Sequence, residues 1–383
     1  METTIETDYY ENGQKQFEGN WKDGKREGLW TKWYENGQKK LEGNWKDGKQ
    51  EGVLTHWYEN GQKQLEVNWK DGRQVGRCNH WYENGQKWSE GNSKDGNREG
   101  LWTEWYENGQ KQLEGNWKGG GLEGLGTQWY ENGQKSGEAN FNGKKEVVWT
   151  TWYENGQIWK EGNYKNGKEE GLYTEWYENG QKKLKRYWKN GKKNGLQSWW
   201  YKDGQRKSEI NFKDGKLEGQ WIEWYENGQI KTERTFKDDK NDGRWVEWYE
   251  GGKIRFDRTF KESKREGFHV EWFENGQKKL EGNWKDGKQE GFHVEWFENG
   301  QKELEGNYNN GKEEGLHTKW YENGKKCSEE NYKDGFYDGL HTWWDENGNK
   351  WIEDDYKDGV KEKKGLVMCS LMTSRMLKGL QKK

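Results

Sequence analysis

The chain of 383 residues contains no proline, and only three of its residues are cysteines. Without proline no backbone amide is missing, so nothing denies a β-ladder its donors. Cys78, Cys327 and Cys369 lie far apart and are odd in number, which favours free thiols in a reducing compartment. The N-terminus has no signal-peptide pattern, and no apolar run reaches the roughly 18–20 residues of a membrane helix. These absences predict a cytoplasmic protein.

The chain also lacks an excess of either charge, with 66 Lys and Arg against 69 Asp and Glu. The two signs alternate, no basic stripe accumulates, and we therefore expect no nucleic-acid partner. Hydrophobic residues make up only 28% of the chain, as in disordered proteins, but aromatic residues reach 16% and include 30 Trp. Because large rings bury much area each, a folded core can be built from few positions.

What the chain has in abundance is one repeated unit. A Trp, usually followed by Tyr-Glu-Asn-Gly, returns every 24 residues with a single one-residue slip, as is typical of repeat proteins. About fifteen copies form an array over residues 9–359, between a lead-in over 1–8 and a tail over 360–383. We interpret the recurring Trp as a structural spine: Trp33, Trp57, Trp81, Trp105, Trp129, Trp152, Trp176, Trp200, Trp224, Trp248, Trp272, Trp296, Trp320 and Trp344.

Each unit contains two turn signals, Asn36-Gly37 and Asp47-Gly48 in the copy over residues 33–56. Both pairs favour two-residue hairpin turns, which leaves strands of about nine residues between them. Frequent glycine and the missing 3.6-residue apolar period oppose helices. The sequence therefore predicts an all-β fold, an elongated meander of about thirty antiparallel strands.

A second aromatic ladder runs from Trp21 through Trp45 to Tyr356 at the same period. Strict two-residue turns put it on the opposite face from the Trp spine, whereas a bulge at the glycines puts both on one face. We expect Gly43 and Gly52 to face each other and to leave a slot for a neighbouring ring. That slot is lost where a larger residue replaces the first glycine, so the units over residues 181–263 should pack differently. The replacements are Arg186, Ile210, Arg234 and Arg258.

The unit Tyr-Glu-Asn-Gly-Gln-Lys, followed by Glu-Gly-Asn-Trp-Lys-Asp-Gly-Lys and Glu-Gly-Leu-Trp, resembles the MORN-repeat variant of bacterial YwqK-like antitoxins. The resemblance covers essentially residues 9–359. It implies β-hairpins stacked into a rod, and it implies a role in neutralising a toxin. MORN proteins elsewhere serve as scaffolds or are linked to membranes.

No residues stand out as a catalytic, cofactor or metal site. His269, His293, His317 and His341 repeat where other units carry Trp, and neighbours at ~9–10 Å are too far apart to share one ion. We interpret them as replacements for a ring in the ladder. Residues 266–289 and 290–305 are almost a verbatim duplication that differs at Lys279 and Glu303. Because a catalytic site needs a unique environment, such copying argues against an enzyme and a small-molecule substrate.

We therefore expect a non-enzymatic protein-binding array that serves as an antitoxin or immunity-type protein. Alternatives are a scaffold or membrane-associated MORN protein, and a binder of cell-wall glycan or choline. The surface expected to meet a protein partner comprises Tyr34, Tyr58, Tyr82, Tyr106 and Tyr130, together with His56, Glu104, Trp199 and Lys319 just before the Trp.

The tail over residues 361–383 differs from the array in being basic and rich in Met. Met368, Met372 and Met376 lie at helical spacing and predict a short amphipathic helix. Three interpretations stay open: a cap over the last hairpin, a segment that touches a partner or a membrane surface, and sequence acquired by frameshift. Membrane contact is expected only through this tail.

Overall fold

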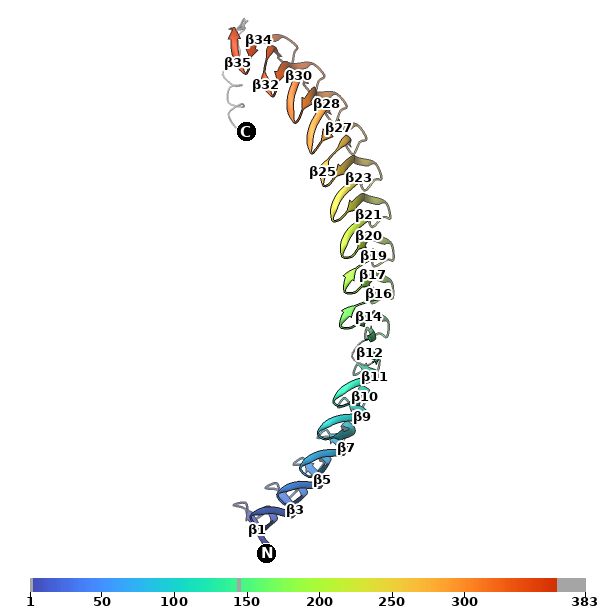
Figure 1. Ribbon diagram of the computed structural model, residues 1–383, viewed down its shortest axis with the longest axis vertical. Helices are drawn as coiled ribbons and strands as arrows, with labels where there is room; N and C mark the ends of the chain where they lie inside the picture. Colours follow the sequence, from blue (N-terminus) through green and yellow to red (C-terminus); the bar gives the residue numbers. More distant parts are fainter. Residues whose placement is uncertain (1–2, 143–145, 364–383) are drawn as a thin grey trace. The chain divides into compact units, whose positions relative to one another are not determined.

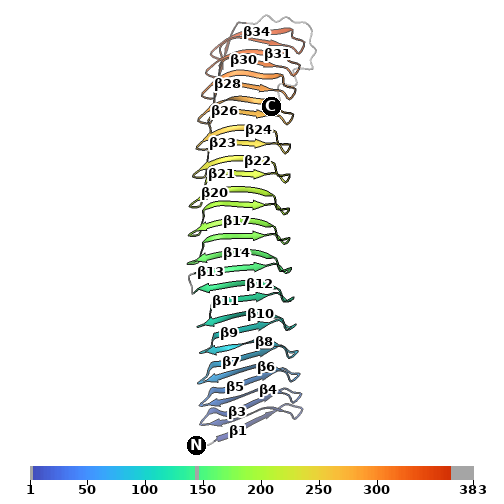
Figure 2. The ribbon, with the colours of Figure 1, turned by 90° about the vertical axis from the view of Figure 1, so that its right-hand side faces the viewer.

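The computed structural model describes residues 3–142 and 146–363, in which strands are joined by short turns and none of the described residues is helical. The chain divides into two units, residues 1–192 and 193–383. Within each unit the strands lie side by side in chain order (Figures 1 and 2). Successive full-length strands pair antiparallel, and all 35 strands belong to one antiparallel sheet. The predicted all-β array of hairpins is confirmed.

The strands up to the boundary between the units are β1 (Thr3–Tyr9), β2 (Lys15–Lys22), β3 (Lys25–Trp33), β4 (Lys39–Lys46), β5 (Lys49–Trp57), β6 (Lys63–Lys70), β7 (Arg73–Trp81), β8 (Lys87–Lys94), β9 (Asn97–Trp105), β10 (Lys111–Lys118), β11 (Gly121–Trp129), β12 (Lys135–Asn142), β13 (Glu146–Trp152), β14 (Ile158–Lys165), β15 (Lys168–Glu169), β16 (Gly171–Trp176), β17 (Lys182–Lys189) and β18 (Lys192–Lys193).

The remaining strands are β19 (Gly195–Trp200), β20 (Arg206–Lys213), β21 (Lys216–Trp224), β22 (Ile230–Lys237), β23 (Lys240–Trp248), β24 (Ile254–Lys261), β25 (Lys264–Arg265), β26 (Gly267–Trp272), β27 (Lys278–Lys285), β28 (Lys288–Trp296), β29 (Lys302–Asn309), β30 (Lys312–Trp320), β31 (Lys326–Lys333), β32 (Phe336–Tyr337), β33 (Gly339–Trp344), β34 (Lys350–Lys357) and β35 (Val360–Lys363).

The Asp-Gly turns form as predicted. Asp47 and Gly48 have φ of 51° and 80°, so both central residues of the turn between β4 and β5 are left-handed, as a two-residue hairpin turn requires. The turn persists where glycine is absent, since Asp238 and Asp239 have φ of 50° and 67°. The hairpin therefore imposes a left-handed backbone even on residues that rarely adopt it.

The Asn-Gly turns differ from the two-residue turns predicted. In the loop between β5 and β6 only Gly61, at φ 83°, is left-handed, and its amide donates to the carbonyl of Tyr58 at 3.0 Å. The amide of Tyr58 in turn donates to the carbonyl of Gln62 at 2.8 Å. The loop is therefore a longer one, with its turn running from Tyr58 to Gly61, and asparagine has a different task, described below.

The predicted pairing of Gly43 with Gly52 is wrong. Gly52 has φ of 78° and lies opposite Trp69 on β6, while Asn44 pairs with Glu51 and Glu42 with Thr55. Between these two pairs β5 therefore has two more residues than β4, which makes a β-bulge. The bulge brings the residue three before each spine Trp opposite the first glycine, as Trp30 lies opposite Gly19. The slot predicted at the first glycine exists. The side chain three residues before the spine Trp fills it, and the second glycine does not lie opposite.

These slot-filling residues, which we call the core row, form the most buried part of the structure. Trp30 and Trp102 are buried, and so are the four histidines predicted to replace a ring. His317 confirms that interpretation, because its ring lies 5.1 Å from Tyr308 and 5.0 Å from Tyr332 between ring centroids. Its Nε2 lies 2.8 Å from the carbonyl oxygen of Asn307.

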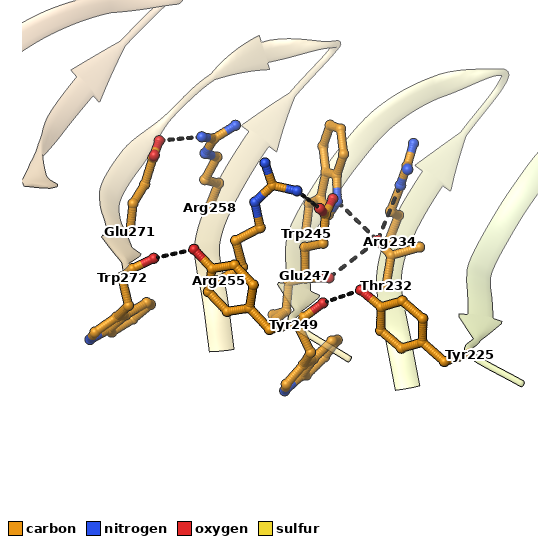
Figure 3. Close-up of polar contacts among 12 residues, drawn as sticks. Tyr225, Thr232, Arg234, Trp245, Glu247, Tyr249, Arg255, Arg258, Glu271 and Trp272 are labelled. Atoms are coloured by element: carbon orange, nitrogen blue, oxygen red, sulfur yellow. Dashed lines mark hydrogen bonds and ion pairs between the residues drawn. The ribbon is translucent and has the colours of Figure 1, made fainter. Parts of the chain in front are cut away.

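The two aromatic ladders lie on opposite faces of the sheet. Rings of the second ladder contact the core row, with Trp21 and Trp45 at 5.3 and 6.1 Å from Trp30. The spine residue Trp272 instead points away from Trp245 of the core row, as Figure 3 shows. The ladders thus lie on the faces that strict two-residue turns would give, although a bulge is present, because the bulge shifts the register by two residues and so keeps each side chain on its face.

Four strands are broken at the bulge into a two-residue piece and a longer one, as in β15 and β16. When the two pieces of each broken strand are counted as one, the described residues form 31 strands, in agreement with the prediction of about thirty.

Residues 3–8, predicted as a lead-in, belong to β1, which pairs with β2. The predicted amphipathic helix over 361–383 falls almost wholly outside the described residues. No helix in the described ranges has the length and apolarity to cross a membrane.

We predict that Gly306→Ala destabilises the array. A Cβ added there would lie 2.3 Å from Nδ1 of His317, so the packed ring would have to move. The free energy of unfolding should fall by about 1–3 kcal/mol, as for other overpacked cores. Urea denaturation measures it, with Gly251→Ala as control, because a Cβ added at that turn meets nothing within 4 Å. Equal effects of the two changes would contradict the slot.

We also predict that acid weakens the hairpins over residues 266–345. Burial lowers the pKa of His269, His317 and His341 below the ordinary value of 6.5. A group with a lowered folded-state pKa binds protons more readily when unfolded, so stability falls as pH drops below 6.5 until the folded pKa is reached. Amide-exchange protection at about pH 7 and about pH 5 measures it. His317→Trp, which copies Trp102, should reduce the loss; an unchanged acid response would count against burial as its cause.

A candidate partner-binding surface

The five tyrosines predicted to face a partner bind the next repeat through their hydroxyls. The hydroxyl of Tyr34 donates to the backbone carbonyl of Trp57 at 2.8 Å. The same bond joins Tyr58, Tyr82, Tyr106 and Tyr130 to the following spine Trp. These rings are half-buried, and burial raises the pKa of Tyr34, Tyr82 and Tyr130. Only the exposed edges of the rings are available to a partner.

Asparagine of the Tyr-Glu-Asn-Gly loop makes a second link between repeats. Asn36 accepts from the backbone amide of Gln38 at 2.9 Å and donates to the backbone carbonyl of Glu59 in the next repeat, also at 2.9 Å. These two bonds explain why asparagine occupies a turn position with ordinary backbone angles. Together, Tyr34 and Asn36 hold successive loops in register.

The spine tryptophans are half-buried, and a row of Lys–Glu pairs covers them. The amine of Lys39 lies 5.8 Å from the centre of the Trp57 ring and forms an ion pair with Glu42. The arrangement recurs along the array, for example at Lys302 and Trp320. Where both contacts form, as at Trp57, the ring lies under an ammonium group and the carbonyl is bound by a tyrosine, which is consistent with a structural task.

The four variable residues predicted before the spine Trp lie on the core-row side of the sheet. His56 and Trp199 are half-buried, and burial lowers the pKa of His56. Glu104 forms an ion pair with Arg98 at 2.6 Å, and Lys319 forms one with Glu330 at 3.1 Å. They come from separate hairpins, so the structure does not bring them together into one site.

Sequence reasoning missed a row of exposed apolar side chains, which we call the apolar row. Its members follow a bulge glycine, except Val148, which follows Val147, and the residues named below are each 40–57% exposed. Val53 lies opposite Asn68 on β6, but the bulge removes it from the pairing with β4. The signal was present in Glu-Gly-Leu-Trp. The row comprises Leu29, Val53, Leu101, Leu125, Val148 and Leu172 in the first unit and Leu196, Phe268, Phe292, Leu316 and Leu340 in the second.

The diverged repeats pack differently, as predicted, and a hollow of about 340 Å³ lies where the last of them meets the following repeat. Arg234 and Arg258 occupy the slot position. The Arg234 guanidinium lies 4.0 Å from the centre of the Trp245 ring, and that of Arg258 lies 4.0 Å from the centre of the Phe256 ring. Arg258 also forms an ion pair with Glu271 (Figure 3). Burial lowers the pKa of Arg234.

Comparison with known families identifies the repeat. The model of the MORN repeat variant matches thirteen segments: residues 3–23, 26–47, 50–71, 74–95, 98–118, 122–142, 145–166, 169–192, 193–214, 217–238, 241–262, 313–334 and 337–358. These cover well over half of the chain. The chain belongs to the MORN repeat variant family. Residues 263–312, between the matched segments, hold the duplicated units and form the same hairpins. The array of MORN repeats is the kind of surface that binds other molecules.

No curated protein matches the chain. Solved structures with some likeness include a complex of TcdB2, TccC3 and Cdc42, at 9% identity and a TM-score of 0.16, and a Tc holotoxin pore of Photorhabdus luminescens, at 12% and 0.17. The matches cover 92% and 94% of this chain but only 26% and 18% of those chains. At such TM-scores the likeness says nothing about how this chain acts.

We predict that Tyr58→Phe weakens the link between repeats without altering the fold. The change deletes the bond to the carbonyl of Trp81 and should cost about 1 kcal/mol of unfolding free energy. Phe273 and Phe297 occupy the same position naturally, so the ring itself is tolerated. Urea denaturation is the measurement, and Phe273→Tyr, which allows the bond to form, is the reciprocal variant. Stabilisation of the array by Tyr58→Phe would contradict this role.

Proposed function

We propose that this chain is a non-enzymatic protein-binding repeat array, and that its partner is a toxin that it neutralises as an antitoxin or immunity-type protein. The apolar row is the observation that carries protein binding. Isolated apolar residues are common on any surface, but a row that recurs with each repeat is not. Its neighbours in successive repeats lie two strands apart, ~9.6 Å, so one partner can contact several of them.

The surroundings of the apolar row suit a protein interface. The strands beside it carry polar residues, such as Asn68 opposite Val53, and ion pairs such as Lys63–Glu66. Arg77 and Arg244 interrupt the row and pair with Glu90 and Asp257. An apolar centre with a polar, charged rim is the usual composition of a protein–protein interface. Because Arg77 and Arg244 occur at only two places in the row, they would fix the position at which a partner binds along the repeats.

The antitoxin half of the proposal rests on the resemblance of the repeat unit to YwqK-like proteins. It needs a partner whose activity the array blocks, and it can fail while protein binding holds. The experiment therefore has two readouts, one for binding and one for neutralisation.

We predict that Phe268→Ser, Phe292→Ser and Leu316→Ser together abolish partner binding. The three side chains are 53%, 40% and 49% exposed, so the fold should change little in stability, by about 0.5 kcal/mol or less each. Tagged full-length chain would be crosslinked in its native host, and co-purified proteins would be identified by mass spectrometry. A partner captured by the native chain and lost from the triple variant is the expected result.

The matched control replaces three exposed residues that each begin a strand, Lys264, Lys288 and Lys312, with serine and should keep the partner. Neutralisation is then tested by expressing the partner alone and together with the chain. Growth arrest that the native chain relieves and the triple variant does not supports an antitoxin. A partner without effect on growth would remove the antitoxin role, and a partner that stays bound to the triple variant would remove the apolar row as its site.

A further inference from the structure

The hollow in the diverged repeats differs from the rest of the array in its walls. Trp245, Phe256 and Trp272 supply aromatic surface, and Arg255, Arg258 and Lys279 supply three positive groups. The negative groups in the lining are Glu247 and Glu271. The lining therefore has an excess of one positive charge. A volume near 340 Å³ lies at the small end of ligand sites and accommodates a side chain or a small anion.

One ion pair of the lining is displaced from its register, and the displacement leaves Lys279 without an ion pair in the described residues, although the bond from His293 and then the charge of Lys279 lower the pKa of the nearby Glu295. Arg255 pairs with Glu247, eight residues earlier, at 2.7 Å. In the same register Lys279 would pair with Glu271, but Glu271 binds Arg258 instead. Among the contacts of the described residues, the Lys279 amine has the Phe273 ring, 5.7 Å from its centre, and no ion pair.

Arg258 lines the hollow and forms its ion pair with Glu271 there. Its guanidinium binds Glu271 through one terminal nitrogen, while its buried Nε has no hydrogen-bond partner among the described residues. Positive charge is crowded here, since burial, and then repulsion from Arg258, lowers the pKa of Arg265. Because Glu271 binds one terminal nitrogen of Arg258, the other terminal nitrogen is left for an incoming carboxylate, which would form a charge-assisted hydrogen bond there.

A near-duplicate of this hairpin in the next repeat shows which residue distinguishes the hollow. Residues 266–281 and 290–305 differ only in that Lys279 is replaced by Glu303, and Lys279 is the one that lines the hollow. In the second copy Glu303 faces Glu295, and burial together with that charge raises the pKa of Glu303. The same hairpin thus folds with either sign of charge, and the positive one stands at the hollow.

We propose that the hollow binds the carboxylate of an acidic side chain from the protein partner, with Arg258 and Lys279 as the groups that meet the carboxylate. The proposal rests on the protein-binding function argued above and assigns it a second, charge-specific contact on the opposite face from the apolar row. The planar guanidinium suits a carboxylate, and Trp245 and Phe256 supply apolar surface for the rest of the side chain and a neighbouring aromatic residue.

The test uses the full chain and two peptides, acetyl-Phe-Glu-amide and acetyl-Phe-Gln-amide, which differ in the carboxylate alone. Binding is followed by calorimetry at low salt. We expect the Glu peptide to bind about tenfold or more tightly than the Gln peptide, since hydrogen bonds to charged groups contribute that much. Lys279→Glu should remove the difference, because it reverses the charge at the rim while copying a residue that the next repeat already carries.

Glu303→Lys is the matched control, with the opposite change one repeat away, and it should leave binding of the Glu peptide within the hollow unchanged. Arg258→Gly restores the slot residue of Gly282 and should also weaken Glu-peptide binding. Equal affinities of the two peptides, unchanged binding by Lys279→Glu, or no binding of either peptide at millimolar concentration would overturn the proposal. So would inorganic phosphate that binds the hollow more tightly than the Glu peptide. None of these outcomes affects partner capture through the apolar row, so the two proposals fail separately.

Discussion

In each hairpin a large side chain lies against a backbone position on the neighbouring strand, and the volumes of the two positions change together. A Cβ added at Gly91 would lie 2.0 Å from the ring of Trp102, so this glycine leaves the room that the ring fills. Where the slot holds Val67, the core row carries Leu54 and Cys78 instead of rings. A chain in which only 28% of residues are hydrophobic can fold because so much of its packing is concentrated at this pair of positions.

Exceptions to this complementarity occur at the uncharged Ile210, which lies opposite Trp221, and at positions where a charged side chain is buried in the core. Arg234 meets the Trp245 ring face to face, which allows a large slot residue beside a large core-row residue. Near the C-terminal end Glu330 occupies the slot, and the hydroxyl of Tyr332 and the amine of Lys319 bind it at 2.8 and 3.1 Å. Buried charge is thus always matched with a ring or an opposite charge, which keeps its desolvation cost tolerable. These exceptional residues also make a few repeats differ from all the others in shape and charge.

Much of the fold followed from the sequence because its signals are local. The 24-residue period, the Asp47-Gly48 turn and the missing proline are enough to predict antiparallel hairpins. The function of Asn36 could not be predicted, because its amide binds a carbonyl in another repeat and the backbone angles follow from that contact. The same holds for the pairing of Gly43, which depends on a bulge whose size the sequence does not specify. The hollow depends on Arg258, rather than Lys279, binding Glu271, a choice that side-chain packing makes.

The links between loops have a consequence for how such a chain can change its length. Tyr34 and Asn36 reach only the next repeat, 23 residues ahead, and where the period shortens by one residue Tyr130 still reaches Trp152, 22 residues ahead. No side chain therefore depends on the total number of copies. A repeat can be gained or lost by recombination within the gene. The two repeats that become neighbours can then form the same Tyr and Asn hydrogen bonds as any other pair of repeats. The near-identity of residues 266–281 and 290–305 is what one such recent gain would leave.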